Sequence, residues 1–68
     1  DTVEVCASVM EVKKGQYKIS LRSKNYADVN KVAGTYGGGG HVRAAGCMLF
    51  GEIEDVLDRL SYTVSQYL

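Results

Sequence analysis

Four consecutive glycines, Gly37 to Gly40, constrain this chain more than any other feature of its sequence. A backbone without Cβ atoms reaches conformations that other residues avoid, so a preceding helix is expected to end at the run. Flexible linkers usually mix glycine with serine between polar segments. This run instead lies between a helix-like segment and an apolar segment, and His41 follows it directly. We therefore predict a tight, packed loop, with a flexible connection as the alternative.

A tight glycine loop also has a chemical consequence. Its backbone N–H groups can form a concave site of partial positive charge that suits phosphate or carboxylate. His41 and Arg43 add side-chain donors beside the run. A loop without a ligand and a purely structural histidine is the other interpretation.

Length and composition indicate one small domain that folds. The chain has 68 residues, of which 46% are hydrophobic, near the size at which a single core is only just adequate. Cys6 and Cys47 lie in apolar, strand-like segments, so we expect buried thiols in a reducing compartment. No apolar run approaches the roughly 20 residues of a membrane span, and no signal-peptide pattern is visible. A cytoplasmic protein is expected, and the non-methionine start at Asp1 suggests a piece of a longer chain.

The net charge is zero, but the charges are unevenly distributed. Between residues 12 and 50 the basic residues face a single acid, Asp28; they are Lys13, Lys14, Lys18, Arg22, Lys24, Lys31 and Arg43. The acids of the C-terminal segment are Glu52, Glu54, Asp55 and Asp58. The glycine run thus lies in the basic part of the chain, which modestly favours an anionic ligand over an ordinary solvated surface.

Hydrophobic periodicity predicts the order of the elements. Residues 3–12 alternate as a half-buried strand, and after a turn at residues 13–16 the segment 17–21 alternates again, with Arg22 pointing away from the core. Asp28 is a suitable N-cap for a short helix that ends at the glycines. Residues 46–50 form an apolar strand expected to be buried on both faces, and an amphipathic helix follows Gly51.

These elements predict an α+β fold, in which two helices pack on one face of a small mixed sheet of about three strands. The expected order is strand, strand, helix, glycine loop, strand, helix. Tyr36, just before the loop, is expected in the core.

The glycine run resembles a known family signature. Gly38-Gly39-Gly40-His41 followed, after two residues, by Ala44-Ala45-Gly46 is similar to the motif of the DHH-associated domain of the DHH phosphoesterases. The segments 19–23 and 28–33 also fall where that family has a comparable Ser-x-Arg-Ser strand end and Asp-Val-Asn helix. The resemblance covers most of the chain and is closest to the branch of oligoribonucleases (nanoRNases), phosphoadenosine phosphate phosphatases and cyclic-dinucleotide phosphodiesterases.

The resemblance implies that residues 1–68 are the C-terminal part of a substrate-binding domain. A separate DHH catalytic domain, absent from this chain, would hold two manganese ions that activate water, so the chain alone would bind no metal and catalyse nothing. The implied partners are that domain, a nucleotide or short single-stranded oligonucleotide and, in the parent, a second copy. The implied phosphate contacts are Arg22, Ser23, Gly38, Gly39, Gly40 and His41. Arg43, at a variable place of the motif, and Tyr26, which could stack on a base, are further candidates.

Two other functions remain open. One is a non-catalytic nucleic-acid-binding module of the kind appended to alanyl-tRNA synthetases, although that branch usually departs from the glycine and Ala-Ala-Gly pattern seen here. The other is an interaction module in which the edge of the first strand mediates self-association.

Overall fold

The two alternating segments at the start of the chain form an antiparallel hairpin in the computed structural model, which describes residues 3–68. β1 (Val5–Lys13) and β2 (Gln16–Ser23) pair over most of their length. The turn between them contains Gly15, whose φ of 76° lies in the left-handed region that glycine adopts without a steric cost. In β2, Ile19 and Leu21 are buried and Lys18, Ser20 and Arg22 are exposed, as the alternation predicts.

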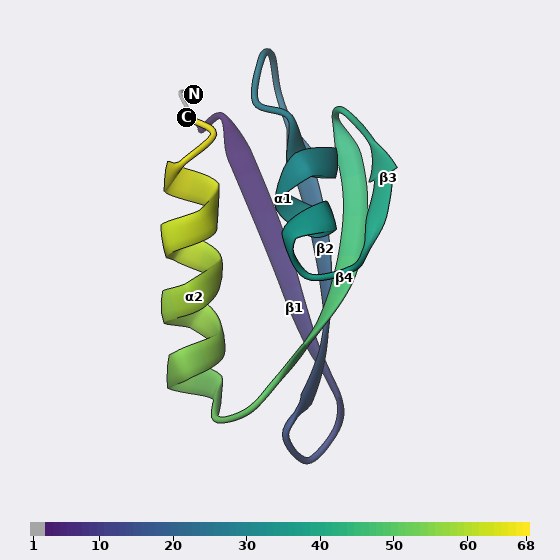
Figure 1. The fold of residues 1–68 in the computed structure, drawn as a ribbon, viewed down its shortest axis with the longest axis vertical. Coiled ribbons are helices and arrows are strands. Elements are labelled where there is room, and N and C mark those ends of the chain that lie inside the picture. Colours follow the sequence, from purple (N-terminus) through teal and green to yellow (C-terminus); the bar gives the residue numbers. More distant parts are fainter. Residues whose placement is uncertain (1–2) are drawn as a thin grey trace.

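Two further strands complete a sheet of order β1-β2-β4-β3. β4 (Ala44–Phe50) pairs with β2, and the short β3 (Gly39–His41) pairs with the beginning of β4. All these pairings are antiparallel. The direction of β4 follows from the connection, because α1 (Val29–Thr35) and β3 together return the chain to the end of the sheet at which β2 stops (Figure 1).

The short helix α1 begins and ends with regular capping geometry. The Asp28 side chain accepts a hydrogen bond from the N–H of Lys31 at 3.1 Å, as expected of an N-cap. At the other end, Gly37 N donates to Gly34 O and Gly38 N to Ala33 O. These two bonds and a φ of 82° at Gly37 form a Schellman motif. The glycines therefore end the helix, as predicted.

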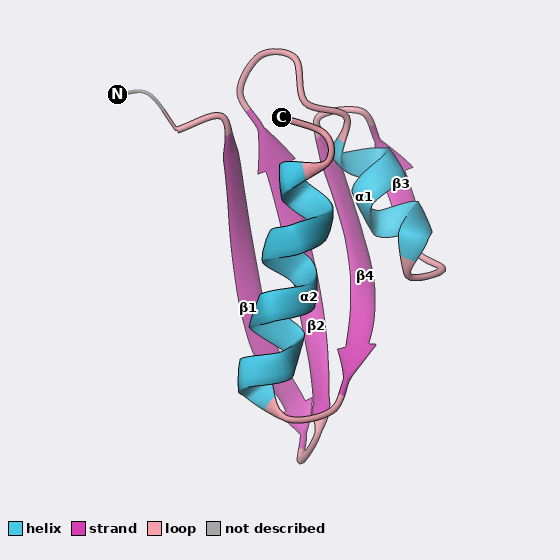
Figure 2. Ribbon diagram, turned by 60° about the vertical axis from the view of Figure 1, so that its left-hand side comes forward, coloured by secondary structure: helices cyan, strands magenta, loops and turns pink. Residues whose placement is uncertain are grey.

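The longer helix α2 (Ile53–Ser65) lies beside α1 on the same face of the sheet (Figure 2). Its first turn contains Glu54 and Asp55, where the helix dipole favours negative charge. The Tyr36 hydroxyl donates to the backbone oxygen of Arg59 at 2.8 Å and so links the end of α1 to α2. No helix within residues 3–68 is long and apolar enough to cross a membrane.

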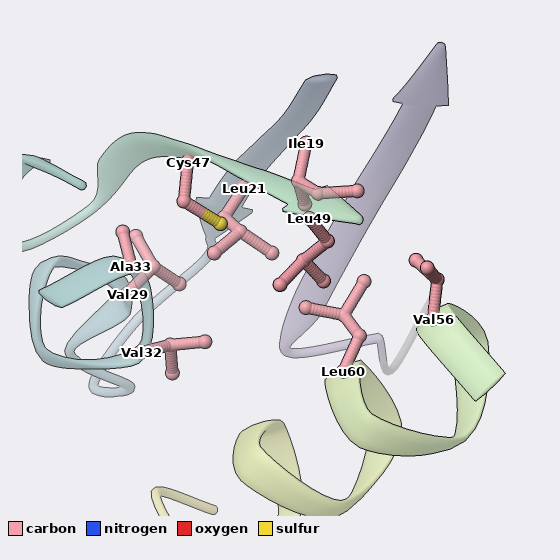
Figure 3. Packing of buried hydrophobic residues seen from close by; sticks show 9 residues of the cluster. All are labelled: Ile19, Leu21, Val29, Val32, Ala33, Cys47, Leu49, Val56 and Leu60. Carbon is pink, nitrogen blue, oxygen red and sulfur yellow. The ribbon is translucent and has the colours of Figure 1, made fainter. Parts of the chain in front are cut away.

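The core lies between the helices and one face of the sheet (Figure 3). Each layer contributes buried side chains: the sheet gives Ile19, Leu21, Cys47 and Leu49, α1 gives Val29, Val32 and Ala33, and α2 gives Val56 and Leu60. Tyr36 packs against this cluster, as predicted.

The α+β class and the two helices on one face are confirmed, with two differences in the sheet. It has a fourth strand, β3, inside the segment expected to be a loop, and it is antiparallel rather than mixed. The expectation that residues 46–50 are buried on both faces is wrong, because Phe50 is 59% exposed. Cys6 is exposed rather than buried. Both errors have one cause: within the described residues the helices cover a single face of the sheet.

Candidate functional site

One row of residues across the helix-free face brings Arg22 and His41 together. In the register of the sheet, Ala44 of β4 lies opposite Arg22 of β2 on one side and opposite His41 of β3 on the other. Residues directly opposite one another on neighbouring strands point to the same face. With strands about 4.8 Å apart, the Cα atoms of Arg22 and His41 are about 10 Å apart. Only the methyl group of Ala44 stands between these two exposed side chains.

A shallow hollow of about 310 Å³ lies beside this row. Its floor is made of small residues, since Gly39, Ala44 and Gly46 carry no long side chain, and Arg22 and Ser20 form its border. Leu21 and Ala45 complete the lining. The hollow is therefore open to solvent, and the guanidinium of Arg22 at its border can reach a ligand that lies in it.

The turn between β3 and β4 lies at the end of the sheet where β2 stops (Figure 1), and it contains a second arginine, Arg43. Arg43 O accepts a hydrogen bond from Ser23 N at 3.0 Å, and Val42 O accepts one from Val29 N at 2.8 Å. These bonds fix the turn against the end of β2 and the start of α1. Within residues 3–68, neither Arg22 nor Arg43 is paired with an acidic side chain, so both guanidinium groups can bind an anion.

The loop after β2 is held by a single carboxylate. Glu4 Oε2 accepts hydrogen bonds from the backbone N–H groups of Asn25, Tyr26 and Ala27 at 3.1, 2.7 and 2.8 Å. These bonds, the one from Ala27 above all, lower the pKa of the Glu4 carboxyl below its ordinary value, against an opposing effect of desolvation. Glu4 was missed as a positioning residue because its partners lie 21 to 23 residues away.

Tyr26 projects from this loop and its side chain is 65% exposed. It lies in the loop after β2, and no contact among residues 3–68 assigns it to the row of Arg22 and His41. Its proposed stacking on a base stays a prediction.

The backbone N–H groups of the glycine run are largely occupied within the chain. Those of Gly37 and Gly38 donate to α1, as described above, and Gly40 N donates to Asn30 Oδ1 at 2.9 Å. The expected cradle of free amides is therefore corrected at these three positions. Gly38 and Gly40 have a steric role instead. Because they carry no side chain, the backbone can approach β4 closely.

Steric requirements differ along the run. A Cβ at Gly38 would lie 2.7 Å from the Cβ of Cys47 and would also overlap Gly46 O. At Gly40, with a φ of 152°, a Cβ would lie 2.6 Å from Ala44 O. A Cβ at Gly39 would meet only Asn30 Oδ1, at an ordinary 3.5 Å. The backbone at position 39 therefore accommodates a side chain.

The hydroxyl of Ser23 does not join Arg22 on the helix-free face. Ser23 lies opposite Val5, which packs against the core, so its side chain shares the opposite face of the sheet. Its Oγ is buried and has no hydrogen-bond partner among residues 3–68. The phosphate contact predicted for Ser23 would therefore need a rearrangement at the end of β2.

Asn30 is a positioning residue that the sequence pattern did not single out. It stands on α1, and its amide oxygen holds the backbone of β3 at Gly40, directly beside His41. An asparagine in the first turn of a helix is a common surface residue, so the local sequence carries no signal for this contact.

Metal ligands do not gather within the described part of the chain. No group of three or more His, Cys, Asp or Glu side chains lies close enough to hold a metal ion among residues 3–68. These residues do not fit the two-ion site implied for a catalytic domain, and no catalytic step is assigned to them.

The curated relatives of this chain are named as oligoribonucleases. The chain is 44% identical over 43 residues to oligoribonuclease NrnB of Bacillus subtilis, covering 62% of this chain and 11% of that protein. It is 40% identical over 62 residues to the probable bifunctional oligoribonuclease and PAP phosphatase NrnA of Streptococcus mutans, covering 88% of this chain and 20% of the relative. The chain thus spans a fifth or less of the length of these relatives.

Solved structures share the fold. An exopolyphosphatase-related protein from Bacteroides fragilis superposes with a TM-score of 0.84 and 29% identity, over 96% of this chain and 19% of that one. The pGpG-specific phosphodiesterase PggH of Vibrio cholerae has a TM-score of 0.71 at 20% identity, over 94% of this chain and 23% of its own, which shows the fold alone.

The family assignment rests on the whole chain rather than on the glycine motif alone. The DHHA1 domain model matches residues 1–68, which agrees with the relatives above and with the fold of the solved structures. The chain therefore belongs to the DHHA1 domain family.

Proposed function

We propose that this chain is the substrate-binding part of a cytoplasmic, metal-dependent phosphoesterase. Its substrates would be short oligonucleotides, dinucleotides or 3′-phosphoadenosine nucleotides. The observation that carries the proposal is the row of Arg22 and His41 on an open face, beside a hollow floored by small residues. The names of the two curated relatives, both oligoribonucleases, support the same substrate class.

Each residue of the row has a role that its chemistry allows. The planar guanidinium of Arg22 matches two oxygens of one phosphate group. His41, on the far side of Ala44, donates a hydrogen bond to another phosphoryl oxygen or to charge that develops there. Arg43, in the turn between β3 and β4, supplies a second guanidinium for the phosphate. Because Gly39 has no side chain, the phosphate can come close to the backbone of β3.

The chemical step belongs to a different part of the proposed enzyme. A DHH catalytic domain of the same protein would hold two manganese ions, which supply an activated water for attack on phosphorus. The role of residues 1–68 is to bind and orient the phosphate across a cleft from that domain. Oriented binding of this kind lowers the barrier without any catalytic group in the binding half.

The test is an assay of the full-length protein that carries this chain, with a dinucleotide as substrate. Arg22→Ala and His41→Ala should each lower kcat/KM by about 10-fold to 100-fold, the value of a hydrogen bond between charged groups. Arg22→Lys should recover only part of the loss, because lysine cannot bind two oxygens in one plane. Lys14→Ala, an exposed cation in the β1–β2 turn, is the matched control.

Full activity in both alanine variants would refute the assignment of the phosphate site. Binding of oligonucleotide without any hydrolysis by the full-length protein would instead identify a non-catalytic nucleic-acid-binding module. In both cases the circular dichroism of the 68-residue variants should match that of the unmodified chain, because both side chains are exposed.

A further inference from the structure

The connection between β2 and α1 directs a series of backbone N–H groups to a single residue. The four consecutive N–H groups of Lys24, Asn25, Tyr26 and Ala27 all donate to Glu4. The first bond goes to the backbone oxygen of Glu4 at 2.8 Å, and the other three converge on its Oε2 atom. Converging amides form a concave site of partial positive charge that suits an anion. In this chain the carboxylate of Glu4 occupies that site.

The same connection is bound to the turn between β3 and β4 on either side of this series. Before the series, Ser23 N donates to Arg43 O, and beyond its end Val29 N donates to Val42 O. The connection therefore joins Glu4, immediately before β1, to the turn that contains Arg43. Because Glu4 keeps the connection in one conformation, it also keeps the two donors of this turn in place.

The two arginines of the candidate site differ in how their backbones are held. Arg22 belongs to a central strand, and its pairing partners are Cys6 of β1 and Ala44 of β4. Arg43 lies outside the strands, in the turn, and its backbone oxygen is bound to the connection instead. The position of Arg43 relative to Arg22 therefore depends on the connection, and through it on Glu4.

Glu4 also shares a hollow with Arg22, where a carboxylate could compete with a phosphate. Both residues line this hollow of about 430 Å³ at the end of β2. An unengaged carboxylate in that place would attract the guanidinium. Instead, three amides hold Oε2, and no ion pair joins Glu4 to Arg22 within residues 3–68. The amides thus keep Glu4 on the loop and leave Arg22 to a ligand.

We propose that Glu4 is a positioning residue for phosphate binding, which sets the place of Arg43 beside Arg22 through residues 23–29. Glu4 itself does not touch the phosphate. A guanidinium that is already in its binding position loses less conformational freedom when the ligand arrives, so the affinity is higher. The inference rests on the proposed function, because it concerns the same phosphate site, and it adds a residue outside that site on which the affinity depends.

The first experiment is an NMR titration of the 68-residue chain with adenosine 3′,5′-bisphosphate up to millimolar ligand. Glu4→Ala leaves three N–H groups without their acceptor and should weaken binding about 5-fold, the value of one long side chain that must be ordered on binding. Glu4→Gln keeps an acceptor oxygen and should recover most of the loss. In the full-length protein, Glu4→Ala should raise KM by a similar factor and change kcat by less than about twofold, because it affects binding alone.

A double-variant cycle shows whether Glu4 acts through Arg43. Arg43→Ala alone should weaken binding of the bisphosphate about 10-fold, the value of a hydrogen bond to a charged group. If Glu4 acts by placing the Arg43 side chain, Glu4→Ala has nothing further to disturb once that side chain is removed. The variant with both substitutions should therefore bind like Arg43→Ala, whereas independent effects would multiply to about 50-fold.

Loss of stability alone is controlled by a substitution at the other end of the sheet. Ile53 lies half-buried beside the β1–β2 turn, so Ile53→Ala should lower the free energy of unfolding without altering the affinity for the bisphosphate. Urea unfolding of Glu4→Ala and Ile53→Ala gives the loss of stability in each. If both variants weaken binding to the same extent, the effect of Glu4 is one of stability, and the positioning role is overturned.

The remaining outcomes separate this inference from the proposed function. If Arg22→Ala weakens binding of the bisphosphate but Glu4→Ala does not, the phosphate site stands and the positioning role fails. A multiplied effect in the double variant also overturns the inference, because Glu4 then acts independently of Arg43. If Arg22→Ala has no effect either, the proposed function fails as well. An unmodified chain that does not bind the bisphosphate overturns the inference alone, since the assay of the full-length protein tests the proposed function separately.

Discussion

At the scale of single residues, the four glycines differ in what they contribute. Gly37 ends α1 in a left-handed conformation, Gly38 lies against β4, and Gly40 combines a φ of 152° with a close approach to Ala44. Of the four, only Gly39 has both room for a side chain and a φ outside the left-handed region, and it borders the hollow beside Arg22. A uniform run in the sequence thus combines three structural positions with one that faces the candidate site.

Alanine substitutions should separate these roles. Gly38→Ala and Gly40→Ala should each lower the free energy of unfolding by about 2 kcal/mol or more, because the added Cβ overlaps backbone atoms of β4 or forces a strained φ. Gly39→Ala should change it by less than about 1 kcal/mol while weakening phosphate binding in the NMR titration. Urea unfolding of the three variants measures the first effect. Equal destabilisation by all three would contradict this division.

Glu4 makes the stability depend on pH in a definite direction. Its pKa in the folded state lies below the ordinary value of 4.5, so the unfolded chain binds the proton more readily. The stabilisation is complete above about pH 4.5 and is lost as the pH falls through the folded-state pKa. The free energy of unfolding of the unmodified chain should therefore exceed that of Glu4→Gln near pH 7.

The difference between these two proteins should shrink below pH 4, as urea unfolding at a series of pH values would show. Glu4→Gln keeps an amide oxygen that can accept hydrogen bonds but does not titrate, which makes it the suitable reference. A difference that stays constant from pH 7 to pH 3 would show that the charge of Glu4 does not stabilise the loop at residues 25–27.

At the scale of elements, α1 connects the core to the site although it is only seven residues long. An isolated helix of this length would not be stable in water. Its buried residues Val29, Val32 and Ala33 attach it to the sheet, while Asn30 extends to β3. The position of His41 on the edge strand therefore depends on a helix whose own stability comes from packing.

Removal of the Asn30 side chain should loosen β3 without unfolding the rest of the domain. Asn30→Ala leaves the N–H of Gly40 without its acceptor, so we expect a loss of about 1 kcal/mol and faster hydrogen exchange at Gly40. Asn30→Asp keeps an acceptor oxygen at this position, and Lys31→Ala, at the next exposed position of α1, is the control. Unchanged exchange in Asn30→Ala would show that β3 is held by its pairing with β4 alone.

At the scale of the whole molecule, stability depends on one small core beneath the two helices. A domain of 68 residues buries a limited fraction of its surface, and its margin of stability is a few kcal/mol. The helix-free face adds little to this core, since Met10 and Phe50 are more than half exposed. Substitutions on the two faces of the sheet should therefore have very different effects on folding.

Two leucines of α2 test the position of the core. Leu60 is 4% exposed and Leu57 is 44% exposed. Leu60→Ala should cost about 2–5 kcal/mol, enough to unfold much of the population at 25 °C. Leu57→Ala should cost less than about 1 kcal/mol. Thermal unfolding followed by circular dichroism compares them, and similar midpoints would show that α2 does not pack as described.

Much of the fold could be predicted from the sequence, because the relevant patterns are local. The alternation in β2 correctly placed Arg22 outside the core, and Asp28 correctly marked the start of α1. β3 was not predicted as a strand, since glycines carry no alternating side chains from which a strand can be read. Cys6 was misplaced because an alternating pattern does not show which face of a sheet remains uncovered.

The sequence by itself determined the order of every element except β3, the face of β2 that turns to the core, and the motif that marks the family. Only the tertiary structure decided which outward-facing residues meet. Arg22 and His41 share a row because β4 lies between their strands with Ala44 in register, and the glycine amides are occupied because Asn30 and the end of α1 lie beside them. Local patterns depend on neighbours along the chain, whereas register and close approach depend on segments that meet only after the chain has folded.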